Sequence, residues 1–267
     1  MKFQLKALAA AAILAAALPA QAVMNTPATG NSSFVLTVLD KVANVSASFD
    51  LGKNYSDFNQ VATAGAVSTV ADKGRSFSWD LATNINYSSA WSSFLGVATL
   101  PNIEYAITAA DNTGAVGPGS RGYITTLQAA GPSLSNNGMI GGMGNFQTYI
   151  DEQNFFGHTA ADGSYYSNTA NSASVLYFNN TVGGSTNGPL TVGAIGSSLG
   201  VIQITYGGSS AFAPTVATIF GNGAQFNLAN NGSLVYSTVA AVPEADTWAM
   251  MLLGLGFMGF VARRKQA

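Results

Sequence analysis

Cysteine is absent from the 267 residues, and charged residues make up only 8% of them. The absence of cysteine excludes a disulfide framework, thiolate metal sites and a cysteine nucleophile. Histidine occurs once, at His158, which leaves a zinc site short of nitrogen ligands. The chain must therefore fold and act without the usual cysteine and histidine chemistry.

Positive charge is scarce in the body of the chain. Residues 23–241 carry 10 acidic and 5 basic side chains, while the two ends hold the other five Lys and Arg residues. No charged residue occurs from Gly163 to Pro243, where Gly, Ser, Thr and Asn alternate with apolar residues. A nucleic-acid-binding protein needs a basic face. The composition therefore predicts no nucleic-acid partner and a surface solvated by amides and hydroxyls.

The first 22 residues have the layout of a secretory signal peptide. Lys2 and Lys6 precede an apolar segment of 12 residues from Ala7 to Leu18. Ala20 and Ala22 then form a small-x-small cleavage site, so we expect cleavage between Ala22 and Val23. This predicts a signal helix at residues 1–22, recognised by the secretion machinery, and a passenger domain over residues 23–241.

Alternating apolar residues predict that the passenger is mainly β. Turn signals separate most of these alternating segments, so the segments are expected to be short strands. Short strands separated in this way favour an antiparallel β-sandwich or a barrel-like fold. The side chains that we expect to be buried are Phe77, Trp79, Leu81, Ile103, Tyr105, Ile107, Ile202 and Ile204. The clearest hairpin joins residues 226–228 to residues 234–236 through Asn231-Gly232, a turn that suits positive φ.

At most two short helices are expected in the passenger. Phe146, Tyr149, Ile150 and Gln153 follow a helical spacing, with Asn145 as the expected N-cap. Residues 87–94 are compatible with either a short helix or a strand.

Two glycine-rich motifs resemble catalytic or nucleotide-binding signatures only superficially. Gly196–Gly200 matches G-x-S-x-G around Ser198, but a strand is expected after it and no acid or histidine follows in the passenger. Gly117–Gly122 matches G-x-G-x-x-G, but residues 123–127 look like a strand rather than a helix N-terminus. We interpret both as loops and strand ends, and expect no catalytic residue and no cofactor.

Ionisable and aromatic clusters give two further candidate sites. Asp151, Glu152, His158 and Asp162 form the densest group of ionisable residues, but their spacing fits no metal-binding motif. We favour a solvated helix end and expect no metal, although calcium is not decided by the sequence. The turns at 154–157 and 165–168 could stack on a sugar, but core aromatics beside turn residues are the favoured interpretation.

The C-terminal end combines a short motif, an apolar segment and a basic tail. Val242, Pro243, Glu244 and Ala245 precede an apolar segment whose ends are Trp248 and Ala262. The tail is Arg263, Arg264 and Lys265. As a helix these 15 apolar residues span only ~22 Å, less than the ~30 Å hydrocarbon core of a bilayer. Trp248 is expected at the headgroup level and the basic tail in the cytoplasm.

This segment, VPEADTWAMMLLGLGFMGFVARRK, closely resembles the PEP-CTERM sorting signal of Gram-negative bacteria. Pro243 and Glu244 match its two defining positions, and Ala245 stands where a second proline is usual. The resemblance implies that exosortase, a membrane-bound cysteine transpeptidase, cuts near Pro243-Glu244. It also implies transient anchoring in the inner membrane, followed by a cell-surface or extracellular location.

The expected function is structural or adhesive, within an exopolysaccharide or biofilm matrix, with extracellular polysaccharide as a possible partner. This follows from the family context and from the uncharged polar composition. One alternative is a secreted hydrolase that acts on polysaccharide through two carboxylates. Another is a protein with a plain C-terminal membrane anchor.

Overall fold

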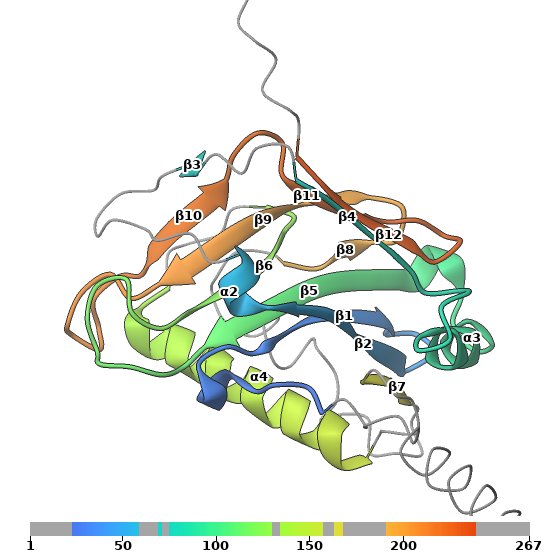
Figure 1. Cartoon of the computed structure of the whole chain (residues 1–267), viewed down its shortest axis with the longest axis horizontal. Coiled ribbons are helices and arrows are strands. Elements are labelled where there is room, and N and C mark those ends of the chain that lie inside the picture. The colour runs from blue at the N-terminus through green and yellow to red at the C-terminus, as the bar shows by residue number, and fades with distance from the viewer. Residues whose placement is uncertain are drawn as a thin grey trace, which may run out of the picture.

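The computed structural model describes residues 23–58, 69–70, 75–129, 134–156, 163–167 and 191–238. The expected signal helix at 1–22 and the expected hydrophobic helix at 248–262 lie outside these residues. Within them, most of the regular structure is β-strand (Figure 1).

Twelve strands form one sheet with the order β4-β12-β11-β9-β6-β5-β1-β2-β7, and β3, β8 and β10 pair off this path. The strands are β1 (Ser33–Asp40), β2 (Val45–Asn54), β3 (Thr69–Val70), β4 (Ser76–Asp80), β5 (Ile103–Asp111), β6 (Gly122–Leu127), β7 (Ser164–Ser167), β8 (Gly193–Ala194), β9 (Ser198–Thr205), β10 (Val216–Phe220), β11 (Gln225–Leu228) and β12 (Ser233–Ser237). In the described part of the chain the strands are connected by the α-helices α2 (Tyr55–Phe58), α3 (Ser88–Leu95) and α4 (Asn136–Phe156), and by the short 3₁₀ turns η1 (Pro27–Thr29) and η2 (Leu100–Asn102). All described strand pairs are antiparallel except β3 with β10.

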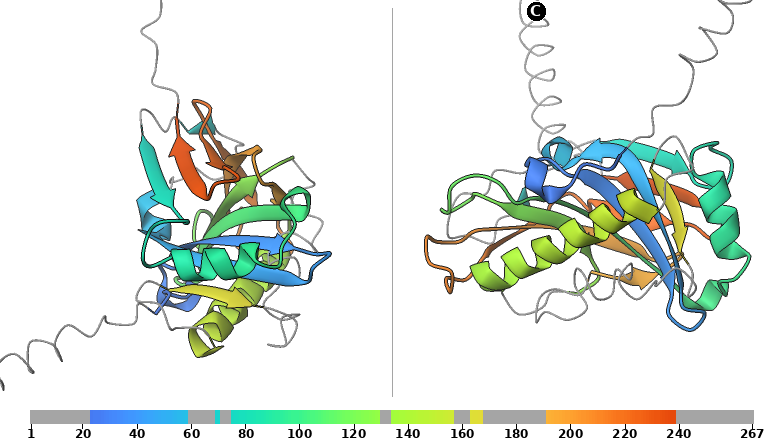
Figure 2. Two further views of the ribbon diagram at one scale, coloured as in Figure 1. Left: turned by 90° about the vertical axis from the view of Figure 1, so that its right-hand side faces the viewer. Right: turned by 90° about the horizontal axis from the view of Figure 1, so that it is seen from below.

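The prediction of a mainly β, antiparallel fold is confirmed. The strands form a single sheet that curls into a half-barrel, instead of two sheets packed face to face (Figure 2). Successive side chains of a strand point to opposite faces, so the long strands supply two separate cores. Phe34, Leu36 and Val38 of β1 lie in the core inside the curl. Val35 and Leu39 lie in the core beneath α4.

Side chains join the two ends of the curled sheet across its open seam. The indole Nε1 of Trp79 on β4 donates to the carbonyl oxygen of Leu51 on β2 at 2.8 Å. The hydroxyl of Tyr87 donates to the carbonyl oxygen of Asp50 at 2.7 Å. Arg75 donates from Nη2 to the carbonyl oxygen of Asp57 at 2.9 Å. The first bond links β4 directly to β2, and the other two involve segments beside these strands, although no described backbone ladder connects β4 to β2.

Six of the eight side chains predicted to be buried are buried, with 5% or less of their surface exposed. Phe77 and Trp79 are only half-buried, which corrects the prediction for these two. They lie on β4, the strand at one end of the sheet path. A terminal strand has a neighbour on one side only, so its inward side chains are less completely covered.

Helix α4 is longer than the sequence indicated, so the expectation of at most two short helices is wrong. It runs for 21 residues from Asn136, and Asn145 lies exposed in its interior instead of capping its start. Four glycines, at 138, 141, 142 and 144, weaken the helix propensity of its first half. Packing of Met139 and Met143 against the sheet overrides that weakness.

Polar bonds fix α4 on the outer face of the sheet, where it crosses β1 and β2 (Figure 2). The side-chain nitrogen Nδ2 of Asn136 donates to the carbonyl oxygens of Gly208 and Ser210, at 2.9 and 2.8 Å. Tyr149 shares a 2.8 Å hydrogen bond with Thr37 of β1. Residues 87–94, which the sequence left open between a short helix and a strand, are mostly helical, as α3.

The predicted hairpin at residues 226–236 is confirmed. Strands β11 and β12 pair with Phe226 opposite Tyr236 and Leu228 opposite Leu234. Gly232 has φ +86°, and a Cβ atom there would lie 2.9 Å from Nε1 of Trp91. The turn therefore needs glycine both for its backbone conformation and for the close packing of α3.

Candidate functional site

Ser198 does not lie on a nucleophile elbow. It is the first residue of β9, and the next described element is another strand, β10. The amide nitrogen of Asn227 donates to its Oγ at 3.2 Å. Gly117–Arg121 form a loop before strand β6, as predicted. Neither glycine motif therefore has the strand-to-helix geometry that its chemistry requires.

The acidic pair on α4 faces outward. Asp151 is exposed and accepts a hydrogen bond from Nε2 of Gln147 at 2.8 Å. Glu152 is half-buried, and burial raises its pKa above the ordinary value. His158 and Asp162, the other members of the predicted cluster, lie outside the described residues. Within the described part of the chain, no group of three or more His, Cys, Asp or Glu side chains is placed to hold a metal ion.

The aromatic turns proposed as stacking surfaces have mixed placements. Asn154 is structural, since it bonds both the backbone nitrogen and the carbonyl oxygen of Met24, at 3.0 and 2.9 Å. Tyr165 and Tyr166 are half-buried on β7 and pack against the two different cores. Phe155 is 80% exposed. The structure does not gather these residues into one surface for a sugar ring.

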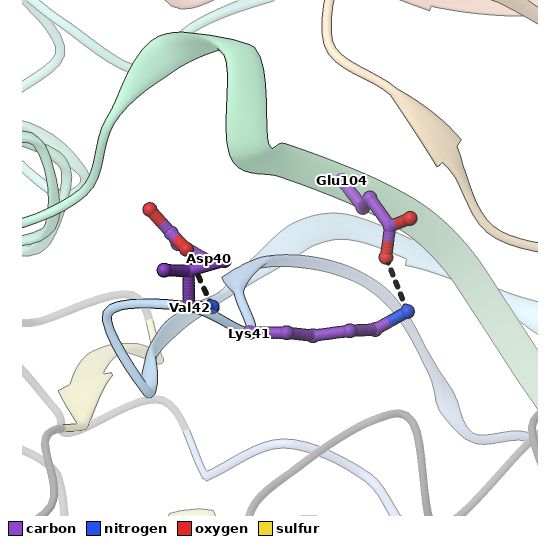
Figure 3. A network of polar contacts seen from close by, with 4 residues as sticks. All are labelled: Asp40, Lys41, Val42 and Glu104. Atoms are coloured by element: carbon purple, nitrogen blue, oxygen red, sulfur yellow. Dashed lines mark hydrogen bonds and ion pairs between the residues drawn. The ribbon is translucent and has the colours of Figure 1, made fainter.

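Asp40 is the most buried carboxylate of the described residues, and it organises a corner of the fold (Figure 3). Its Oδ1 accepts the backbone N–H groups of Val42 and Ala43, at 2.9 and 3.0 Å, and its Oδ2 accepts that of Thr99 at 2.9 Å. Burial alone would raise the pKa of Asp40, but together these N–H groups and Asn102 lower it below its ordinary value. Beside it, Lys41 Nζ lies 2.5 Å from Oε2 of Glu104, on the surface.

We expect Asp40→Asn to lower the free energy of unfolding by about 1–3 kcal/mol at neutral pH. An amide places an N–H₂ donor against one of the N–H donors that the carboxylate now accepts. Because the folded pKa of Asp40 is lowered, its stabilising contribution is present above its unfolded pKa and is lost as the pH falls through the folded value. Urea unfolding from pH 7 down to pH 3 measures the difference between the two proteins.

That difference should shrink toward the acid end. Asp151→Asn on the exposed face of α4 is the matched control and should change stability by no more than about 0.5 kcal/mol. A loss for Asp40→Asn that stays constant through the acid range would contradict the role assigned to the carboxylate.

The outer face of the β4-β12-β11 wing carries the feature that sequence reasoning missed. Along these strands the side chains that point away from the core are uncharged apart from Asp80, and all but Val235 are polar. They are Ser76, Ser78 and Asp80 on β4, Ser233, Val235 and Ser237 on β12, Gln225 and Asn227 on β11, and Ser198 at the start of β9; we call this set the polar face. The sequence signal for this face was the alternation, every second residue, of these side chains with buried ones such as Leu234 and Tyr236.

A shallow cleft of about 500 Å³ opens at one end of the polar face. The residues that line it are Ser78, Trp79, Asp80, Ala82, Thr83, Asn231 and Ser233. Asp80 is the one carboxylate among them, and its hydrogen bonds from the hydroxyl and backbone of Thr83 hold its pKa below the ordinary value. The cleft therefore offers hydroxyls, an amide and one ionised carboxylate.

The described chain ends close to the start of the C-terminal segment. Strand β12 ends at Ser237, and Thr238 donates its backbone N–H to Arg75 at 3.0 Å. Only residues 239–241 separate Thr238 from Val242, a reach of at most ~14 Å over four residue steps. The edge of the sheet at Thr238 and Arg75 is therefore only a few residues along the chain from the sorting segment.

Among the described residues, no helix is long and apolar enough to cross a membrane. The sorting residues 242–245, the segment ends Trp248 and Ala262, and the basic tail lie outside them, as do Ala20 and Ala22. Val23 is the first described residue and is 63% exposed.

Comparison with known proteins bears on the C-terminal segment. No significant match to the chain was found among curated proteins or among solved structures. The model of the PEP-CTERM protein-sorting motif matches residues 241–265. Residues 241–265 are therefore a PEP-CTERM sorting motif, which implies an exported protein that exosortase processes.

Proposed function

We propose that the mature protein is a structural or adhesive component of an extracellular polysaccharide matrix, of the biofilm type, made by a Gram-negative bacterium. The observation that carries this proposal is the sorting motif at 241–265, joined to a passenger whose polar face is almost free of charge. Exosortase is the transient partner, and polysaccharide is the lasting one.

The chain is then divided into three functional parts. Residues 1–22 act as the signal peptide, with Ala20 and Ala22 before the cut and Val23 as the first mature residue. Residues 23–241 are the β-rich passenger. Residues 242–267 carry the motif Val242-Pro243-Glu244-Ala245, the membrane segment from Trp248 to Ala262, and the basic tail at 263–265.

Support for a non-enzymatic role comes from the geometry of the cleft. A glycosidase uses two carboxyl groups ~5–10 Å apart across the scissile bond. Among the described residues that line the cleft, only Asp80 carries a carboxyl group. Its Oδ1 already accepts hydrogen bonds from the backbone N–H groups of Ala82 and Thr83. This arrangement favours binding over the hydrolase alternative.

Fractionation of a biofilm culture tests the proposal. We expect most of the protein in the matrix fraction, and we expect 1 M NaCl to leave it there, because salt screens ionic contacts and the polar face has almost none. Enzymatic digestion of the matrix polysaccharide should release it. Release by salt alone, or recovery mainly in the free medium, would contradict an uncharged adhesive contact.

The same purified protein separates the adhesive role from the enzymatic one. Incubation with matrix polysaccharide should produce no new reducing ends above those of a boiled sample. A steady increase in reducing ends that depends on folded protein would establish the hydrolase instead.

A further inference from the structure

The rows of the polar face run straight across four strands. Ser78 of β4 lies opposite Val235 of β12, which lies opposite Asn227 of β11, which lies opposite Ser198 of β9. Neighbouring strands lie ~4.8 Å apart, so this row is ~14 Å long. It begins at the cleft, since Ser78 also lines it. A ligand that follows the row is therefore an extended chain instead of a single small molecule.

The chemistry of the cleft and the row selects among polymers. A serine hydroxyl both donates and accepts a hydrogen bond, and an amide does the same through its two atoms. Sugar hydroxyls have this same double character. Asp80 is the only charged residue of the set and remains ionised at neutral pH. An anionic polymer would meet its negative charge, and no described lining residue supplies a cation to offset it.

The wing that carries the row is held rigidly from behind. Trp79 anchors β4 through its bond to Leu51. On the inner side of β11 and β12, the rings of Phe226 and Tyr236 contact each other at a tilt of 47°, with centroids 4.8 Å apart. A surface that is already ordered loses little conformational entropy when a ligand binds.

We infer that the cleft and the row Ser78–Val235–Asn227–Ser198 bind a segment of a neutral, hydroxyl-rich polysaccharide. This inference rests on the proposed function and adds the binding site and the class of polymer. Ser78 and Ser233 contribute hydroxyls at the cleft. Asn227 contributes its amide oxygen along the row, because its amide nitrogen already donates to the carbonyl oxygen of Gly196 and to Oγ of Ser198.

Affinity electrophoresis of the exported protein tests this site, with gels that contain dextran, soluble cellulose oligosaccharides, alginate or chitosan. We expect retardation by at least one of the two neutral glucans and none by alginate. The variant Ser78→Ala/Ser233→Ala removes two hydroxyls without changing charge. Its dissociation constant should rise by about 5- to 30-fold, the loss of two ordinary hydrogen bonds.

The matched control is Ser89→Ala/Ser93→Ala, two exposed serines on α3. It should migrate as the parent protein does. Equal binding by the cleft variant and the parent would overturn the site, and binding only to alginate or only to chitosan would overturn the polymer class. Absence of binding to both glucans would overturn the inference as well. The matrix fractionation described above tests the proposed function without these gels. A negative result in the gels would therefore refute the binding site, whereas a negative fractionation result would refute the proposed function.

Discussion

Replacing Phe226 with alanine should lower the free energy of unfolding by about 3–5 kcal/mol, a typical cost for removing a fully buried phenylalanine. Its side chain has no exposed surface and lies at the centre of the curled sheet. Its ring centroid is 4.8 Å from that of Tyr236, 6.0 Å from that of Phe34 and 6.4 Å from that of Trp79. The substitution therefore leaves a cavity among side chains of β1, β4 and β12.

Urea unfolding of the two proteins, followed by tryptophan fluorescence, measures this loss. Phe212→Ala is a strict control because it removes the same ring from a position that is 85% exposed. It should change the stability by no more than about 0.5 kcal/mol. Similar losses for the two variants would mean that the inner aromatic core does not hold the sheet as described.

Replacing Glu244 with alanine should stop processing and leave the full-length protein in the inner membrane. Glu244 lies within the matched sorting motif, and we propose that exosortase reads Pro243 and Glu244 directly. Immunoblots of membrane and extracellular fractions measure the result. Glu152→Ala removes the same carboxylate from the passenger and should leave processing unchanged. Normal release of the Glu244→Ala protein would show that the motif is not read at this position.

Neutralising Arg263, Arg264 and Lys265 should have a different effect. We propose that these residues hold the C-terminal tail on the cytoplasmic side, because the apolar segment before them is short for a bilayer. We expect weaker retention and some unprocessed protein outside the membrane. A change at Glu244 therefore traps the chain, whereas a change in the tail lets it escape.

The strands could be predicted from the sequence because their pattern is local. Ile103, Tyr105 and Ile107 alternate with residues that do not join the same core, and the Asn231-Gly232 turn fixes the last hairpin. The start of α4 could not be predicted in the same way. Its glycines argue against a helix locally, and contacts with residues distant in the sequence stabilise it. These are the hydrogen bonds of Asn136 to Gly208 and Ser210 and the packing of Met139 and Met143 in the core beneath α4.

The candidate binding site was predicted only in part. Composition indicated an uncharged polar surface, but not where it would gather. Ser78 and Ser198 lie 120 positions apart and share a row only because β12 and β11 lie between them in the sheet. Such a row depends on strand order and register, which alternation alone does not determine. The residues that the sequence analysis considered as candidates and set aside, Asp151 and Phe155, lie near the C-terminal end of α4.

The most direct test of the whole account is mass spectrometry of the C-terminus of the protein recovered outside the cell. The account predicts a mature chain that begins at Val23 and ends near Pro243-Glu244, with the segment from Trp248 to Ala267 removed. An extracellular protein that still carries Trp248 to Ala267 would contradict it, and the C-terminal segment would then be an ordinary hydrophobic tail.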